Sequence, residues 1–121
     1  MYFTSEEKKA IARVAAEMTL ADGNVAPKEV LFNVAVYRKL GITTSEMESS
    51  SSVSLSSAMH TISKMTSEEK KFVSAYLGAI IIVDGDISDK EMTLWRTIST
   101  ICEFETMHLA DTPEILKNYL L

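Results

Sequence analysis

A stretch near the start of the chain recurs 62 residues later, and this repeat constrains the fold more than any other feature. Residues 4–9 read Thr-Ser-Glu-Glu-Lys-Lys, and residues 66–71 read the same six letters. At the same offset, the Asp-Gly pair at 22–23 recurs at 84–85. Such self-similarity indicates two copies of one supersecondary unit that pack on each other. We therefore predict two repeat units, residues 4–42 and 66–104, joined by a connector at residues 43–65.

Each repeat unit has the pattern of a helical hairpin. It begins with a capping box, in which a threonine side chain and a glutamate three residues later satisfy free backbone amides: Thr4 with Glu7, and Thr66 with Glu69. Apolar residues at helical spacing follow, then an Asp-Gly pair that ends the helix, and then a second helical stripe. The segment from Phe72 to Val83 is apolar nearly all round. We therefore expect it to be the central, most buried helix.

The remaining segments also favour helices. The connector is dense in serine between Ser49 and Ser57, but apolar residues punctuate it, so we expect short helices with serines facing water. Residues 111–114 read Asp-Thr-Pro-Glu, which is typical of a helix start and predicts a short final helix. No segment alternates with a period of two for long enough to predict a strand. The sequence predicts a single all-α domain over residues 1–121, with about seven helices.

Small residues occur four apart in the first helix of each unit. Ala12 and Ala16 in the first copy align with Ser74 and Gly78 in the second. Small side chains let two helices approach closely, toward the short end of the ~8–10 Å range of interaxial distances. This pattern predicts that the two helices cross at these residues.

Charge and composition exclude several classes of function. Twelve Lys and Arg against 17 Asp and Glu give a net charge of −5, the wrong sign for a nucleic-acid-binding surface. The apolar run at 75–83 is far shorter than the ~20 residues that span a bilayer, so we expect no membrane insertion. The single cysteine, Cys102, cannot form an internal disulfide, and the first residues have no apolar signal core, which favours the cytoplasm. No nucleophile elbow, phosphate-binding loop or dinucleotide motif occurs, so we expect no enzyme.

The repeated signature itself reads Asp-Gly-x-apolar-x-x-Lys-Glu, at residues 22–29 and 84–91. Its Asp, Gly, apolar residue and Glu match the second half of an EF-hand calcium loop. The first half does not match, because its first and third ligands would be Met18 and Leu20 in one copy and Ile80 and Ile82 in the other. These motifs are therefore not EF-hands.

With a helix on each side, and present twice about sixty residues apart, the motif resembles the signature of the TerB-like tellurite-resistance domain. The resemblance covers nearly the whole chain. It implies an all-α fold with a pseudo-two-fold arrangement of helices, a role in resistance to tellurite and other stresses, and metal binding by shared acidic residues. The matching acids are Asp22, Glu29, Asp84 and Glu91. The chain departs from the family in its serine-rich connector and its modest length.

Physical reasoning gives these acids a candidate role as metal ligands. If the hairpins pack about a two-fold axis, the two motifs converge, and two unit charges 4 Å apart repel by about 4 kcal/mol at an effective dielectric of ~20. A divalent cation relieves this repulsion, and a site with only oxygen ligands selects Ca²⁺, Mg²⁺ or Mn²⁺. The candidate ligands are Asp22, Glu29, Asp84, Asp86 and Glu91, and the surrounding binding surface would include Asp89, Lys28 and Lys90.

A second interpretation needs no metal. Glu91 can complete a capping box with Ser88, Glu29 can bind free amides in a first turn, and the aspartates can bind turn amides, each worth about 1 kcal/mol. The acidic surface would then bind a basic partner in an interaction or assembly module. Either interpretation predicts a protein partner, and a homodimer is one form of it. Carboxylates within about 6 Å of each other across the two copies would favour a shared site.

Overall fold

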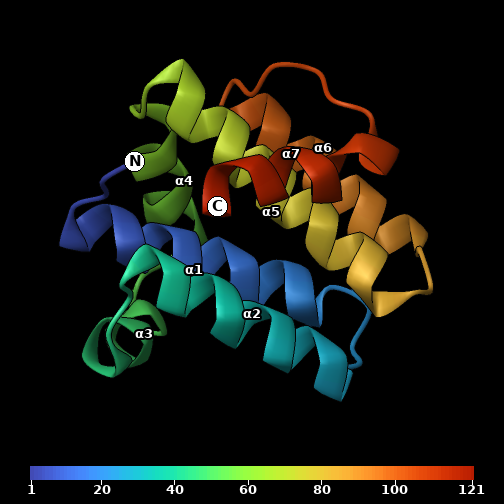
Figure 1. Ribbon diagram of the computed structural model, residues 1–121, viewed down its shortest axis with the longest axis horizontal. Coiled ribbons are helices and arrows are strands. Elements are labelled where there is room, and N and C mark those ends of the chain that lie inside the picture. Colours follow the sequence, from blue (N-terminus) through green and yellow to red (C-terminus); the bar gives the residue numbers. More distant parts are fainter.

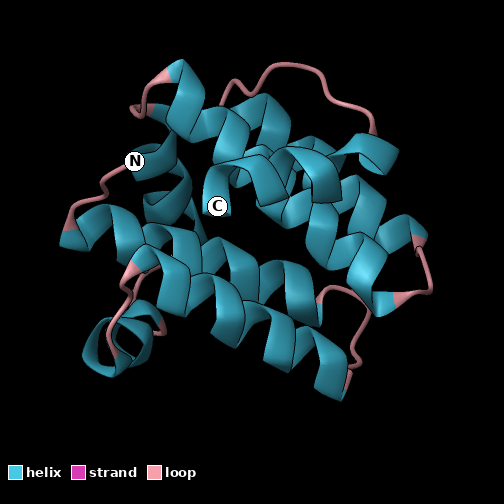
Figure 2. Cartoon of the chain, viewed as in Figure 1, coloured by secondary structure: helices cyan, strands magenta, loops and turns pink.

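Helices account for 74% of the residues and strands for none in the computed structural model, which describes residues 1–121 (Figure 2). The predicted all-α architecture is confirmed. The seven α-helices, with one short 3₁₀ helix before the last of them, are α1 (Ser5–Leu20), α2 (Pro27–Leu40), α3 (Thr44–Ser50), α4 (Leu55–Ser63), α5 (Ser67–Asp84), α6 (Asp89–Ile101), η1 (Leu109–Asp111) and α7 (Thr112–Leu120) (Figure 1). The helices are too short or too polar for any of them to act as a membrane span.

The helix boundaries repeat at the offset found in the sequence. Helices α1 and α5 begin at Ser5 and Ser67, and α2 and α6 begin at Pro27 and Asp89, so each pair of starts lies 62 residues apart. The predicted capping boxes at Thr4 and Thr66 are present. Side-chain caps of this kind stabilise a helix by about 1 kcal/mol each. Local chemistry therefore sets where the helices of both units begin.

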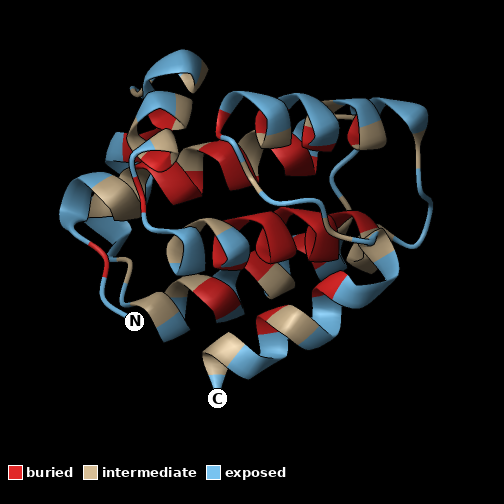
Figure 3. Cartoon of the chain, turned by 90° about the horizontal axis from the view of Figure 1, so that it is seen from above, coloured by how far each residue is buried: buried red, intermediate tan, exposed pale blue.

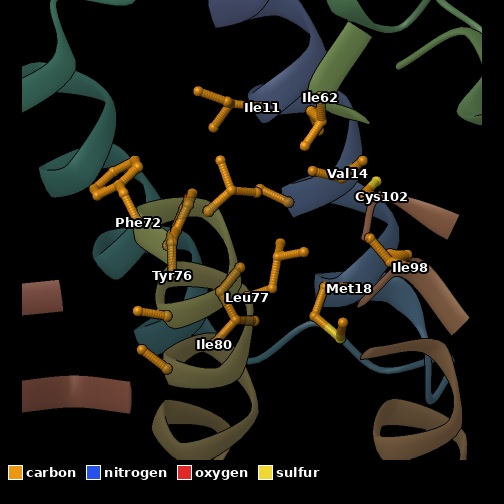
Figure 4. Packing of buried hydrophobic residues seen from close by; sticks show 14 of the residues in the cluster. Ile11, Val14, Met18, Ile62, Phe72, Tyr76, Leu77, Ile80, Ile98 and Cys102 are labelled. Atoms are coloured by element: carbon orange, nitrogen blue, oxygen red, sulfur yellow. The ribbon is translucent and has the colours of Figure 1, made fainter. Parts of the chain in front are cut away.

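Helix α5 is the centre of the core, as its sequence predicts. Every residue from Phe72 to Ile81 is buried, and α1, α2, α6 and α7 all contact this helix. Figure 3 shows the buried residues gathered between the helices, and Figure 4 shows Ile11 and Val14 of α1 close to the side chains of α5. Burying an aliphatic or aromatic side chain fully is worth about 1.5–3 kcal/mol. Packing on α5 therefore fixes the relative positions of the two hairpins.

The connector forms two short helices that pack on α1, as expected. Ala58 and Ile62 of α4 are completely buried. Most of the serines face water, and the exception is Ser50, which is buried and donates a hydrogen bond to the Met47 carbonyl at 2.6 Å. The serine-rich composition reflects an exposed helix face rather than a flexible linker.

The predicted crossing of α1 and α5 at small residues is wrong. A Cβ atom added to Gly78 would lie 2.5 Å from the Cγ2 atom of Thr112, so this glycine lets α7 approach α5. Ser74 faces α6, where its carbonyl accepts a hydrogen bond from Trp95 Nε1 at 3.1 Å. The contact between α1 and α5 is made by larger apolar side chains, including Met18 and Leu77 (Figure 4). The four-residue spacing correctly identified a helix face made of small residues, but it could not predict which helix packs against that face.

Candidate metal centre

The two motifs take the same backbone course. Each first helix ends in a turn where a glycine adopts a left-handed conformation, with φ of 83° at Gly23 and 81° at Gly85. The amide of each glycine donates to the carbonyl three residues earlier, at 2.9 Å in the first copy and 3.0 Å in the second. Glycine adopts positive φ without the steric cost that other residues incur. The chain then reverses and enters the second helix within a few residues.

The last residue of each motif is a buried glutamate at the start of the second helix. Glu29 and Glu91 are each 1% exposed. One oxygen of Glu29 accepts the Ala26 amide at 3.1 Å. The matching oxygen of Glu91 accepts the Ser88 amide at 3.1 Å and the Ser88 hydroxyl at 3.0 Å. The capping role that the sequence predicted for Glu91 is present, and Glu29 makes the corresponding bond to the backbone.

The acidic side chains of the two copies meet. Carboxylate oxygens of Asp22, Asp84 and Glu91 all lie within 4.8 Å of one another. Glu29 adjoins the same group, because the nearby Asp84 and Asp22 carboxylates both act on its pKa. We call these four residues the acidic cluster. Asp22 comes from the first repeat unit and Asp84 and Glu91 come from the second, so the distance between these three satisfies the condition set out above for a shared site.

Burial and mutual repulsion both oppose charge in the acidic cluster. Burial raises the pKa of Glu29, and the bond from the Ala26 amide lowers it. The Asp84 carboxylate raises this pKa again, by its charge and by accepting a hydrogen bond from the protonated Glu29 carboxyl, and the Asp22 charge adds to the effect. Burial likewise raises the pKa of Glu91, with the Ser88 bonds opposing this and the two aspartates adding to it. Loss of hydration and like charge act in the same direction on a buried carboxyl.

The acidic cluster has no ion-pair partner. The two ion pairs of the protein, Lys9 with Glu6 and Arg13 with Glu17, both lie along α1. Oδ2 of Asp84 is the one buried side-chain nitrogen or oxygen in the molecule that has no hydrogen-bond partner. An unpaired buried oxygen of this kind is costly, and in a native structure a protonated neighbour, a water molecule or an ion satisfies it.

The other predicted site residues lie around the acidic cluster rather than in it. Asp86 and Asp89 are exposed and outside the group of converging oxygens. Lys28 reaches toward the second motif, because a Cβ on Gly85 would lie 3.2 Å from its Nζ atom. Lys90 and Asp89 line a shallow depression beside the end of α1. The full burial of both glutamates was not predicted, and the only signal for it is their identical place in the two copies.

Comparison with solved structures finds a protein that this chain resembles along nearly its whole length. A crystal structure of a protein of unknown function from Porphyromonas gingivalis W83 is 36% identical in sequence, and the match covers 98% of this chain and 92% of that chain with a TM-score of 0.84. Searches with protein-family models and among curated proteins find no match. At this identity and coverage, the chain belongs to the same family as the Porphyromonas gingivalis protein.

Proposed function

We propose that the protein is a non-enzymatic, TerB-like binding module that holds a divalent cation between its two repeat units. The observation that carries this proposal is the convergence of acidic side chains from both copies, around a buried Asp84 oxygen without a partner. A cation there would neutralise charges that the surrounding protein leaves unbalanced. The cation's role is structural: it joins the two hairpins at their motif turns.

The donor set favours a hard cation. All the available ligand atoms are carboxylate oxygens, which suit Ca²⁺, Mg²⁺ or Mn²⁺ better than zinc. Each glutamate already uses one oxygen to bind its own N-cap residue, which holds the side chain in place and leaves its second oxygen available. Ligands fixed in this way lose little conformational entropy when a cation binds.

The wider role follows from the resemblance to the TerB-like family. That resemblance supports a stress-response function, such as resistance to tellurite, in the cytoplasm. The negative net charge and the exposed Asp86 and Asp89 beside the acidic cluster support a protein partner rather than a nucleic acid. In this role the module would bind and assemble rather than catalyse.

A metal-free interaction module is the second candidate, and specific bonds favour it. Glu29 and Glu91 each accept the amide of the N-cap residue of their own helix, and Asp22 accepts the Asn24 amide at 3.0 Å. These bonds explain three of the four cluster residues without a cation. They do not account for Asp84, whose free oxygen is therefore the feature that separates the two proposals.

Thermal melting with and without cation tests the proposal. With Ca²⁺, Mg²⁺ or Mn²⁺ at 100 times its Kd, bound cation should stabilise the fold by about 2.7 kcal/mol and raise Tm by roughly 10 °C. The double variant Asp84→Asn with Glu91→Gln should lose this rise. Asp86→Asn is the matched control, because Asp86 lies in the same turn outside the acidic cluster, and it should keep the rise.

Two results would decide against the cation. If none of the three cations raises Tm of the unmodified protein, the acidic cluster is not a metal site. If the double variant melts at a lower temperature than the unmodified protein in a chelator and still gains the full rise in Tm with cation, the acids stabilise the fold as caps and not as ligands. The metal-free module would then be the better proposal.

A further inference from the structure

A groove with a volume of about 390 Å³ lies between α2 and α7, over α5. Helices α2 and α7 both pack on α5 but make little contact with each other (Figure 1). The volume falls within the range of pockets that hold small molecules, about 300–1,000 Å³. We call it the α2–α7 groove, and most of its lining is apolar: Phe32 from α2, Ala79, Ile82 and Val83 from α5, and Leu116 and Leu120 from α7.

Two lysines are the only charged residues in this lining. Lys39 lies in the last turn of α2, and Lys117 lies in the last turn of α7. Both are exposed, and neither belongs to an ion pair, because the two ion pairs of the protein lie along α1. The α2–α7 groove therefore combines apolar walls with two unpaired positive charges, one from each side.

The equivalent place in the other half of the molecule is polar. It is the shallow depression between α1 and α6. Glu17 of α1 stands there at the position that Ala79 occupies in the α2–α7 groove, 62 residues later. Helix α6 adds Asp89 and two threonines to that lining. The duplicated fold therefore does not require an apolar groove at this place.

The two lysines are likewise particular to the α2–α7 groove. At the 62-residue offset, Lys39 corresponds to Ile101, and Lys117 corresponds to Leu55. A lysine in the last turn of a helix also complements the negative end of the helix dipole. Arg38 serves that purpose in the same turn of α2 but lies outside the groove. Apolar walls edged by two cations instead complement a hydrocarbon chain that ends in a carboxylate.

We propose that the α2–α7 groove binds a medium-chain fatty acid, with its hydrocarbon chain on α5 and its carboxylate between Lys39 and Lys117. The volume suits one such chain, whereas a phospholipid has two longer chains and a bulkier head group. A partner helix, about 10–12 Å in diameter with its side chains, is also too wide for a groove of this volume.

This inference goes beyond the cation site and does not depend on it. None of the four residues of the acidic cluster lines the α2–α7 groove. We would measure fatty-acid binding in a chelator, which also prevents the acid from precipitating with calcium. The fatty-acid proposal can therefore fail while the cation-dependent rise in Tm remains, and the reverse also holds.

Isothermal titration calorimetry of the full chain with sodium decanoate, below its micelle concentration and in about 0.15 M salt, is the test. Decanoate should bind saturably, with one molecule per chain. The double variant Lys39→Glu with Lys117→Glu should bind it at least tenfold more weakly, because both cations become repulsive. Arg38→Glu is the matched control: Arg38 is exposed in the same turn as Lys39, and this variant should bind within about twofold of the unmodified protein.

Two further ligands test the head group and the chain separately. Decyltrimethylammonium has the same chain length with a positive head group and should not bind measurably. Octanoate lacks two methylenes and should bind roughly tenfold more weakly than decanoate, because each buried methylene contributes about fourfold in affinity. The melting temperature of each variant confirms that it is folded before its affinity is compared.

Four outcomes would overturn the proposal. The first is the absence of saturable decanoate binding, and the second is an equal loss of affinity in Arg38→Glu and in the double variant. The third is equal binding of decyltrimethylammonium, which would mean that the lysines do not recognise the carboxylate. The fourth is binding to vesicles that contain phosphatidylglycerol without binding to decanoate, which would assign the two lysines to a membrane surface.

Discussion

The two motif copies share a backbone but differ in how their polar atoms are satisfied. In the first copy, Asp22 lies beyond the end of α1 and accepts the Asn24 amide, and the N-cap residue is Ala26, which has no hydroxyl. In the second copy, α5 continues through Asp84, whose Oδ2 is left without a partner, and the Ser88 hydroxyl both donates to and accepts from Glu91.

This difference shows which residues can distinguish a cap from a metal ligand. Both glutamates are held by capping bonds, so either explanation accounts for them. Asp22 has a local hydrogen bond as well. Only Asp84 has a buried oxygen that no local interaction uses. The duplication of the turn therefore explains why the acids meet, while the argument for a cation depends on one residue of the second copy.

The largest expected effect separates the two aspartates. The Asp84 charge raises the pKa of each buried glutamate more than the Asp22 charge does, and Asp84 Oδ2 is buried. We expect Asp84→Asn to remove the full cation-dependent stabilisation of about 2.7 kcal/mol at 100 times Kd. Asp22→Asn should keep part of it. Calorimetric melting of both variants, with and without cation, measures the difference.

If Asp84→Asn and Asp22→Asn lose the same amount of cation-dependent stabilisation, the two copies contribute equally to cation binding. The free oxygen of Asp84 would then have no special role. The metal-free melting temperatures give an independent check. Asp84→Asn should melt no lower than the unmodified protein in a chelator, because it removes the like charge that faces the two glutamates and keeps a side-chain oxygen for the contact with Glu29.

The sequence predicted the helix boundaries and caps around this site better than it predicted the surroundings of the acidic side chains. The helix starts at Ser5 and Ser67, and the box formed by Ser88 and Glu91, are local features that depend on residues within one turn. That Asp84 lacks a partner depends on how side chains from both halves pack, which no local pattern specifies. The contact of Gly78 with Thr112 is of the same kind, because it depends on where the last helix docks.

The ends of α2 and α6 give a second, smaller contrast between the copies. Gly41 and Glu103 lie 62 residues apart and both have positive φ, at 70° and 60°. The turn is the same in each, since the Ile42 amide donates to the Tyr37 carbonyl at 2.9 Å and the Phe104 amide donates to Ser99 at 2.8 Å. A left-handed conformation costs a residue with a side chain about 1–2 kcal/mol relative to glycine. The second copy therefore carries backbone strain that the first avoids.

Substitutions at positions 103 and 41 should change the free energy of unfolding in opposite directions. We expect Glu103→Gly to stabilise the fold by about 1 kcal/mol and Gly41→Ala to destabilise it by a similar amount, measured by urea unfolding. A Cβ at position 41 would meet only the Lys8 ammonium, at an ordinary contact distance of 3.8 Å, so its cost is conformational. A loss of stability in Glu103→Gly would indicate that the Glu103 side chain contributes more than the relaxed backbone gains.

The smallest effect is a change of stability with pH. It follows from the pKa values of Glu29 and Glu91, which are raised mainly by burial and further by the neighbouring aspartates. Between the pKa of a glutamate in the unfolded chain, about 4.3, and the higher folded value, the folded protein binds more protons than the unfolded chain. The free energy of unfolding must therefore fall as pH rises through that window in the cation-free protein. Replacing either glutamate with glutamine should reduce this fall, as measured by urea unfolding across that range. A free energy of unfolding that instead rises with pH there, and does so less in the glutamine variants, would mean that the capping bonds outweigh burial, so that the charged glutamates stabilise both turns without a cation.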